Sequence, residues 1–246
     1  MTIRKTASLN VTVSIVFLCC LMFMASCATV GTETDIQNSA ARHKVGVGYY
    51  SEGKIQQAFL EFQHAYELNP QNKEALYGIG IIYLLDFDET LKAIDFFERA
   101  VKIDPSYSEA YNNLGYANAK LGKFDTAIPF YKKAVSNLLY TTPEKAYVGM
   151  GRAYYRLGKY DDAVVAYKEA LKRAPNFDLP YLGLALCYNA TGKYGEASAA
   201  LTHAIALNPQ YKGNTKIAAE DYMMRKLVAP TDDQKDFADY LEILKY

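Results

Sequence analysis

The sequence predicts an all-α protein, a right-handed solenoid of helix-turn-helix repeats with C-terminal capping helices. One observation is the stretch 110–134, AYNNLGYANAKLGKFDTAIPFYKKA, which divides into two helical stripes around a turn at Leu121-Gly122-Lys123. A second observation is that this spacing of small and large residues returns four more times at near-constant intervals. Such a period indicates stacked units, each of which buries an apolar face against the next.

The repeat unit is marked by small residues on both of its helices. An alanine of the second helix recurs in steps of 35, 34, 36 and 34 residues, at Ala58, Ala93, Ala127, Ala163 and Ala197. A small residue of the first helix recurs in the same register, at Gly46, Gly80, Gly115, Gly151 and Ala185. Small residues at a helix crossing let two backbones approach, and a nearby aromatic ring fills the remaining space. Four copies close with a proline that stops the second helix, at Pro70, Pro105, Pro175 and Pro209.

This pattern is typical of the tetratricopeptide repeat. It predicts five repeats across residues 39–211, at about 39–72, 73–107, 108–141, 144–177 and 178–211. The second repeat has an extra residue in its turn, and the third lacks its closing proline and runs through residues 136–143 into the fourth. These insertions either change the superhelix locally or are neutral changes in a surface turn.

The N-terminal segment has the features of a lipoprotein signal peptide, predicted over residues 1–26. Arg4 and Lys5 precede an apolar run of about 14 residues, which is shorter than the roughly 20 that span a bilayer. The run ends in Met24-Ala25-Ser26-Cys27, which resembles a bacterial lipobox. We expect Cys27 to be acylated and to anchor the chain, with residues 27–38 as the lipidated cysteine and its flexible tether. The alternative is ordinary cleavage after Ser26 or Ala28.

Charge and cysteine content narrow the function classes. Without the predicted signal the chain holds 25 basic against 27 acidic residues. It therefore has no excess of positive charge that would attract nucleic acid. Cys19 and Cys20 lie in the predicted signal, which leaves Cys187 without a disulfide partner once Cys27 carries lipid. We interpret Cys187 as a small buried hydrophobe rather than a reactive thiol.

Residues 212–246 are predicted to form capping helices over the last repeat. In the final helix an apolar stripe is formed by Phe237, Tyr240, Leu241 and Leu244, and Thr231 with Gln234 has capping-box spacing. The alternative is that this helix binds a partner or a membrane surface. Its acidic face would be repelled by an anionic membrane.

No motif of an enzyme is present. His43, His64 and His203 lie in different repeats, and no pair has metal-ligand spacing. The glycines occur singly at helix crossings and form no phosphate-binding loop. We therefore expect no catalytic residue, metal, cofactor or small-molecule substrate, and a function in binding proteins.

A solenoid binds partners in a concave groove lined mainly by the first helix of each repeat. In each first helix, the residues that do not belong to the stripe packed against the second helix are expected to face this groove. They are His43, Val47, Tyr50, Tyr77, Ile81, Leu84, Asn112, Tyr116, Val148, Arg152, Tyr155, Leu182, Leu186 and Asn189. The predicted lining is apolar and rich in tyrosine, which favours a site that buries side chains.

The lipobox, the tether, the repeats and the run over residues 111–177, from YNNLGYANAKLGKF to KRAPNF, together resemble the type IV pilus lipoproteins called pilotins. The matching feature within this run is a short insert before a repeat that starts with Tyr140, Pro143 and Ala146. The resemblance implies an exported protein that its N-terminal lipid anchors to the periplasmic face of the outer membrane. Its partner would be a secretin subunit, which it would help to reach that membrane and to multimerise into the pilus exit pore. Two alternatives remain: a general periplasmic adaptor for cell-wall enzymes or proteases, and a scaffold in another envelope complex.

Overall fold

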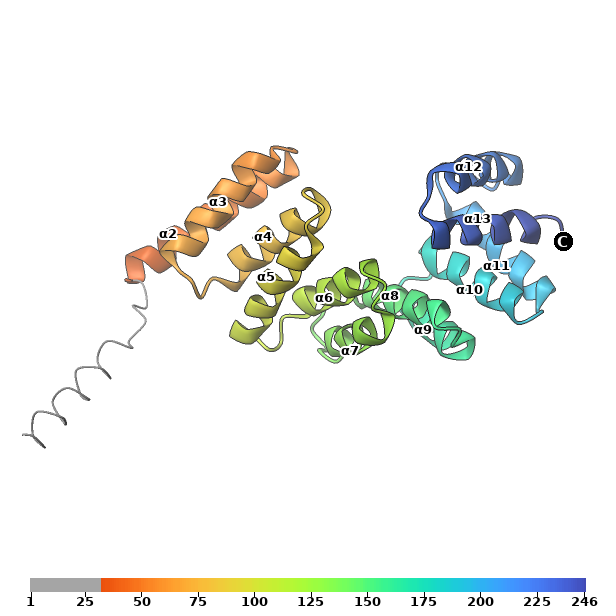
Figure 1. The fold of residues 1–246 in the computed structure, drawn as a ribbon, viewed down its shortest axis with the longest axis horizontal. Helices are drawn as coiled ribbons and strands as arrows, with labels where there is room; N and C mark the ends of the chain where they lie inside the picture. The colour runs from red at the N-terminus through yellow and green to blue at the C-terminus, as the bar shows by residue number, and fades with distance from the viewer. Residues whose placement is uncertain (1–31) are drawn as a thin grey trace, which may run out of the picture. The chain divides into compact units, whose positions relative to one another are not determined.

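A computed structural model describes residues 32–246, which form twelve α-helices and no strand (Figure 1). The helices are α2 (Glu33–Ser51), α3 (Ile55–Leu68), α4 (Lys73–Leu85), α5 (Thr90–Ile103), α6 (Ser108–Lys120), α7 (Phe124–Val135), α8 (Pro143–Arg156), α9 (Tyr160–Arg173), α10 (Asp178–Ala190), α11 (Tyr194–Leu207), α12 (Thr215–Val228) and α13 (Thr231–Ile243). The all-α prediction is confirmed. The described residues divide into two compact units, one ending at Ala75 and the other Leu76–Tyr246.

In the first unit, α2 begins earlier than the sequence pattern indicates. The predicted repeat starts at residue 39, but the helix starts at Glu33, so residues 33–38 of the predicted tether are helical. The Thr32 hydroxyl accepts from the Asp35 backbone N–H at 3.2 Å, and the Asp35 carboxylate accepts from the Thr32 N–H at 2.9 Å. This capping box lowers the pKa of Asp35 through the hydrogen bonds from Thr32. Cys27 and the predicted signal lie outside the described residues.

In four of the helix pairs the crossing of the two helices depends on a glycine that faces an aromatic ring. A Cβ on the glycine would lie 2.6 or 2.7 Å from the ring in four pairs: Gly46 with Phe62, Gly80 with Phe97, Gly115 with Tyr131, and Gly151 with Tyr167. In the fifth pair Ala185 takes the glycine position and Leu201 the aromatic position, and both are fully buried. The larger residue on one helix is thus matched by a smaller one on the other, as close packing requires.

The turns between paired helices place one residue in the left-handed region of backbone conformation. Gly53, Gly122, Gly158 and Gly192 occupy this position with φ of 72 or 73°. In the second repeat, where the turn is one residue longer, Asp88 occupies it with φ of 56°. Asp tolerates this conformation better than most residues. Its carboxylate pairs with Lys120 Nζ at 2.6 Å, so the longer turn is tied to the next repeat.

The insert between α7 and α8 projects two leucines from the surface. Leu138 and Leu139 are almost fully exposed, whereas the next residue, Tyr140, is buried. The Asn137 side-chain amide donates to the Ser106 carbonyl at 3.0 Å, and Pro143 begins α8. The insert is therefore held at both ends while its tip remains open.

The last helix pair departs from the packing of the others. Within the second unit α8 packs along α7 and α10 along α9, so each pair stacks on the one before. In contrast, α12 contacts α11 only slightly, and α13 lies against α10 and α11 (Figure 1). The capping box expected from Thr231 and Gln234 is absent, because Thr231 is already the first helical residue and Gln234 donates to the Ala229 carbonyl.

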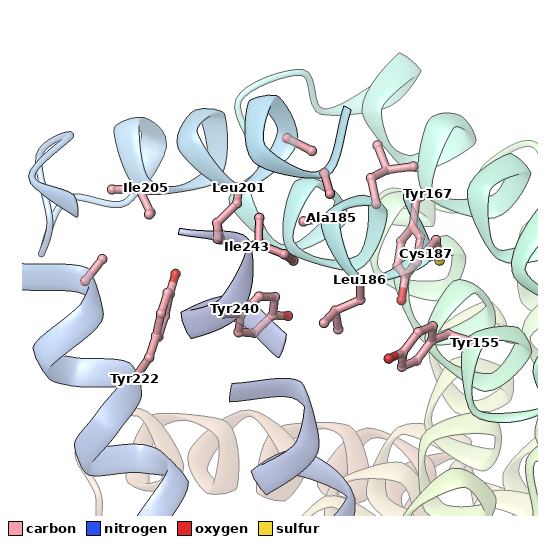
Figure 2. Packing of buried hydrophobic residues seen from close by; sticks show 14 of the residues in the cluster. Tyr155, Tyr167, Ala185, Leu186, Cys187, Leu201, Ile205, Tyr222, Tyr240 and Ile243 are labelled. Atoms are coloured by element: carbon pink, nitrogen blue, oxygen red, sulfur yellow. The ribbon is translucent and has the colours of Figure 1, made fainter. Parts of the chain in front are cut away.

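Cys187 lies in the core of the second unit with no exposed surface (Figure 2). Burial raises the pKa of its thiol to about 12, so only about one part in 10,000 is ionised at pH 8. We expect a chain whose other cysteines are replaced by serine to react with a thiol reagent such as Ellman's reagent at least 100-fold more slowly when folded than in 6 M guanidinium. Rapid reaction of the folded chain would contradict the burial of Cys187.

Candidate partner-binding face

The first helices of the fourth and fifth repeats, α8 and α10, share a surface that we call the inner face. Five of the predicted groove residues lie together on it and line one cavity of about 320 Å³: Val148, Arg152, Tyr155, Leu182 and Leu186. The opposite wall of the cavity belongs to the last helix pair, through Tyr222, Arg225, Asp233, Asp236, Phe237 and Tyr240. The structure thus brings these five residues together, but the inner face on which they lie is covered by α13, and partner binding by them stays a prediction.

Two arginines of α8 hold α13 in place. Arg156 donates to both carboxylate oxygens of Asp236, at 2.7 and 2.6 Å, and to Asp233 at 3.0 Å. Arg152 also pairs with Asp233. The side chains of Arg156 and Asp236 are only 9% and 13% exposed. Burial opposes the charge on Arg156, yet the two carboxylates outweigh it and raise the pKa of the guanidinium.

Aromatic and aliphatic side chains extend this contact along α13. Tyr240 and Ile243 are buried, and Figure 2 shows Tyr240 between Tyr222 on one side and Leu186 on the other. The rings of Tyr222 and Tyr240 are 5.2 Å apart between centroids. Burial raises the pKa of Tyr155 and of Tyr240, which further disfavours ionisation of both hydroxyls.

The other predicted groove residues differ in exposure. Val47 and Tyr116 are exposed, and Leu84 is fully buried. The rest are partly buried: His43, Tyr50, Tyr77, Ile81, Asn112 and Asn189. The Tyr77 hydroxyl accepts from the Asn113 side chain at 2.9 Å, and burial lowers the pKa of His43, whose ring lies 5.5 Å from Phe62. Partner binding by these residues stays a prediction.

Two buried polar atoms of the described residues have no hydrogen-bond partner. They are the Asn189 side-chain oxygen, on α10, and the Tyr222 hydroxyl, on α12. A buried polar group without a partner carries a desolvation cost of roughly 1–3 kcal/mol. Tyr222 lines the cavity at the inner face, so the packing of the last helix pair there leaves one buried hydroxyl without a hydrogen-bond partner.

Sequence reasoning did not place Asp233 and Asp236 of α13 against the inner face, because the acidic side of the final helix was interpreted only as a surface that an anionic membrane would repel. It also missed Arg156. A signal was present, because Arg156 lies one helical turn after Arg152 and therefore on the same side of α8.

Between residues 32 and 246 no group of three or more His, Cys, Asp and Glu side chains could hold a metal ion. Over the same range no helix has the length and apolar character needed to cross a bilayer.

Models of tetratricopeptide families match most of the predicted repeat region. A model described as a tetratricopeptide repeat matches residues 108–137 and 144–177, a second so described matches 180–211, and one described as a TPR repeat matches 91–122. The matched residues fall within the predicted third, fourth and fifth repeats and the second half of the second repeat.

Curated relatives share these repeats over short segments. The chain is 30% identical over 115 residues to a probable UDP-N-acetylglucosamine–peptide N-acetylglucosaminyltransferase, SPINDLY, from Hordeum vulgare, covering 44% of this chain and 12% of that protein. It is 37% identical over 76 residues to anaphase-promoting complex subunit 3 of Schizosaccharomyces pombe, covering 31% and 11%. The chain thus spans only about an eighth of the length of these relatives.

Solved structures match over a much larger share of both chains. The structure of MamA is 25% identical with a TM-score of 0.60, covering 72% of this chain and 96% of that one. PilW, described as a widely conserved type IV pilus biogenesis factor, is 21% identical with a TM-score of 0.63, covering 85% and 98%. PilF of Pseudomonas aeruginosa is 18% identical with a TM-score of 0.65, covering 87% and 99%. At identities of 21% and 18%, the matches to PilW and PilF show a shared fold and nothing more.

The family models, the consecutive helix pairs and the structural neighbours agree on one fold. Proteins of this fold typically act as scaffolds that bind other proteins, without enzymatic activity of their own. The chain carries tetratricopeptide repeats, and its described residues have the all-α fold of a tetratricopeptide solenoid.

Proposed function

We propose that this chain is an exported lipoprotein of the outer membrane that binds a secretin subunit and assists its localisation and multimerisation, as a pilotin does. The anchor is the lipid on Cys27, and the partner is held by the helical repeats. Lipid and repeats together concentrate the secretin at the membrane where it must assemble.

The observation that carries the binding function is the inner face of α8 and α10. Its cavity of about 320 Å³ combines apolar and aromatic walls with the guanidinium groups of Arg152 and Arg225. Aromatic residues and arginines are the side chains that most often dominate protein–protein binding energy. No catalytic group is needed for this role.

The pilus assignment rests on the lipobox, the tether and the insert with Tyr140, Pro143 and Ala146, which resemble pilotins. The insert is a distinct surface feature, since its Leu138 and Leu139 are exposed beside the buried Tyr140. The matches to PilW and PilF support the proposal only through the fold, which they share over nearly their whole length.

The test is to delete the gene and to probe unboiled outer-membrane fractions for the secretin on a gel. We expect the secretin to shift from multimer to monomer, because its subunits are no longer brought together at the membrane. The intact gene should restore the multimer, whereas Cys27→Ala should give a folded protein that does not.

Persistence of the multimer after deletion would contradict the pilotin proposal. The chain would then be a periplasmic adaptor for other enzymes or a scaffold of another envelope complex. Affinity purification from membranes would identify its partner. Full restoration of the secretin multimer by Cys27→Ala would contradict only the proposed role of the lipid.

A further inference from the structure

The helix α13 is seated on the inner face through a defined set of side chains. Asp233 and Asp236 lie one helical turn apart and face Arg152 and Arg156, and Tyr240 follows one turn later. Phe237 packs with Tyr222 and Tyr240 at the same wall. The acidic residues and the two aromatic rings fall at positions i, i+3, i+4 and i+7, which is one side of a helix.

The arginines make this seat selective. Arg156 donates two hydrogen bonds to the two carboxylate oxygens of Asp236. In this bidentate geometry the planar guanidinium matches a carboxylate. A helix with basic residues at these positions would bring like charges together on a half-buried surface. The inner face therefore favours an acidic amphipathic helix over a neutral or basic one.

The contact of the last helix pair with the rest of the unit is incomplete. The cavity remains between α13 and the inner face, and the buried Tyr222 hydroxyl has no partner among the described residues. In addition, α12 contacts α11 only slightly and exposes a row of apolar side chains: Ile217, Met223, Met224, Leu227 and Val228. These features lower the free energy needed to separate α12 and α13 from the inner face.

We propose that the inner face of α8 and α10 binds an acidic amphipathic helix of a partner protein, and that α13 occupies this site until the partner displaces it. The partner helix presents two carboxylates one turn apart to Arg152 and Arg156, followed by aromatic residues that enter the cavity. This inference rests on the proposed function only in requiring a protein partner. Helix-in-groove recognition supplies the binding mode, and α13 shows the chemistry that the groove accepts.

The closed α13 acts as an internal competitor. A partner can bind only the fraction of molecules in which α13 is open, so its apparent affinity is reduced by that fraction. Removing the carboxylates of α13 weakens the contact of α13 with the inner face and leaves the residues of the inner face unchanged. Binding of a separate acidic helix should then become tighter.

The experiment uses the full chain and a fluorescein-labelled peptide with the sequence of residues 229–246, with anisotropy as the readout. We expect the D233N/D236N chain to bind this peptide at least tenfold more tightly than the wild-type chain does. A matched control is Asp232→Asn, which removes a carboxylate from an exposed position of the same helix. Its affinity for the peptide should equal that of the wild-type chain. A peptide that carries D233N/D236N should bind at least tenfold more weakly than the wild-type peptide.

Equal binding by the D233N/D236N and Asp232→Asn chains, or equal binding of the two peptides, would overturn the proposal. If the D233N/D236N chain does not fold, amide hydrogen exchange of the wild-type chain tests whether α13 opens independently of α10. We expect α13 to exchange through a local opening while α10 stays protected. Equal protection of both helices would show that α13 opens only on global unfolding, and would also overturn it.

These outcomes are separate from those of the secretin test. The peptide assay contains no secretin, so its failure leaves the pilotin proposal intact. Conversely, a secretin multimer that survives gene deletion does not affect what the peptide assay reports.

Discussion

Replacing Gly183 with alanine is expected to lower the free energy of unfolding of the Leu76–Tyr246 unit by about 3 kcal/mol. A Cβ at this position would lie 2.1 Å from Cζ of Tyr167 and 2.5 Å from two further ring atoms. The ring has little room to move, because Tyr167 is buried and also approaches the backbone of Gly151 closely. Thermal unfolding followed by circular dichroism should show a melting temperature lower by roughly 6–12 °C.

The control is Gly195→Ala on α11, the other helix of the same pair. No described atom lies within 4 Å of a Cβ there, so the added methyl meets open space. Alanine also has the higher helix propensity, and we expect this variant to gain up to about 1 kcal/mol. Equal effects of the two substitutions would contradict the close approach of Tyr167 to Gly183.

A second substitution should rescue part of the loss. In the fifth repeat, alanine at the glycine position is accompanied by Leu201 in place of the aromatic ring. The double variant Gly183→Ala with Tyr167→Leu should therefore be more stable than the sum of the two single changes predicts. Strict additivity in urea unfolding would mean that the ring and the methyl group do not compete for the same space.

The helix pairs could be predicted because their determinants are local and repeat. The glycine of the first helix and the aromatic residue of the second, such as Gly151 and Tyr167, are 16 residues apart, and their spacing alone indicates a crossing. The start of α2 escaped prediction for an opposite reason. Its determinant is a single capping box of Thr32 and Asp35, which has aspartate in place of the usual glutamate or glutamine and no apolar stripe beside it.

The candidate site was only partly predictable, because half of it comes from the far end of the sequence. Removal of the packing stripe left Arg152 and Tyr155 as candidate groove residues, and in the structure both line the cavity at the inner face. The pairing of Arg152 and Arg156 with Asp233 and Asp236 spans 77 to 81 residues, and no periodicity reports it. An acidic helix face is the same in sequence whether it meets water or two arginines.

Replacing Arg156 with methionine is expected to lower the free energy needed to separate α13 from the inner face by about 3 kcal/mol. The change leaves the carboxylate of Asp236 nearly buried and without its bidentate partner. Because α13 is the last helix of the described residues, the loss should appear as local opening of α13. Amide hydrogen exchange of α13 should become about 100-fold faster, with much smaller changes in α8 and α9.

The matched control is Arg173→Met. Arg173 also pairs with a carboxylate, that of Glu169 at 3.0 Å, but this pair lies one turn apart on the exposed side of α9. Pairs of this kind contribute at most about 1 kcal/mol, so exchange in α9 should change by less than about fivefold. A large effect of Arg173→Met would mean that loss of the long side chain, and not burial of the pair, sets the outcome.

The double variant R156M/D236L separates the cost of an unpaired charge from the value of the ion pair. A buried pair loses much of its attraction to desolvation, and apolar residues of similar size can replace it without loss of stability. We therefore expect R156M/D236L to recover most of the protection of α13 that Arg156→Met removes. It should also lose selectivity for the acidic peptide, since the guanidinium that recognises the carboxylate is gone. If the double variant opens as readily as Arg156→Met, the pair itself holds α13, and the aromatic contacts of Phe237 and Tyr240 contribute little.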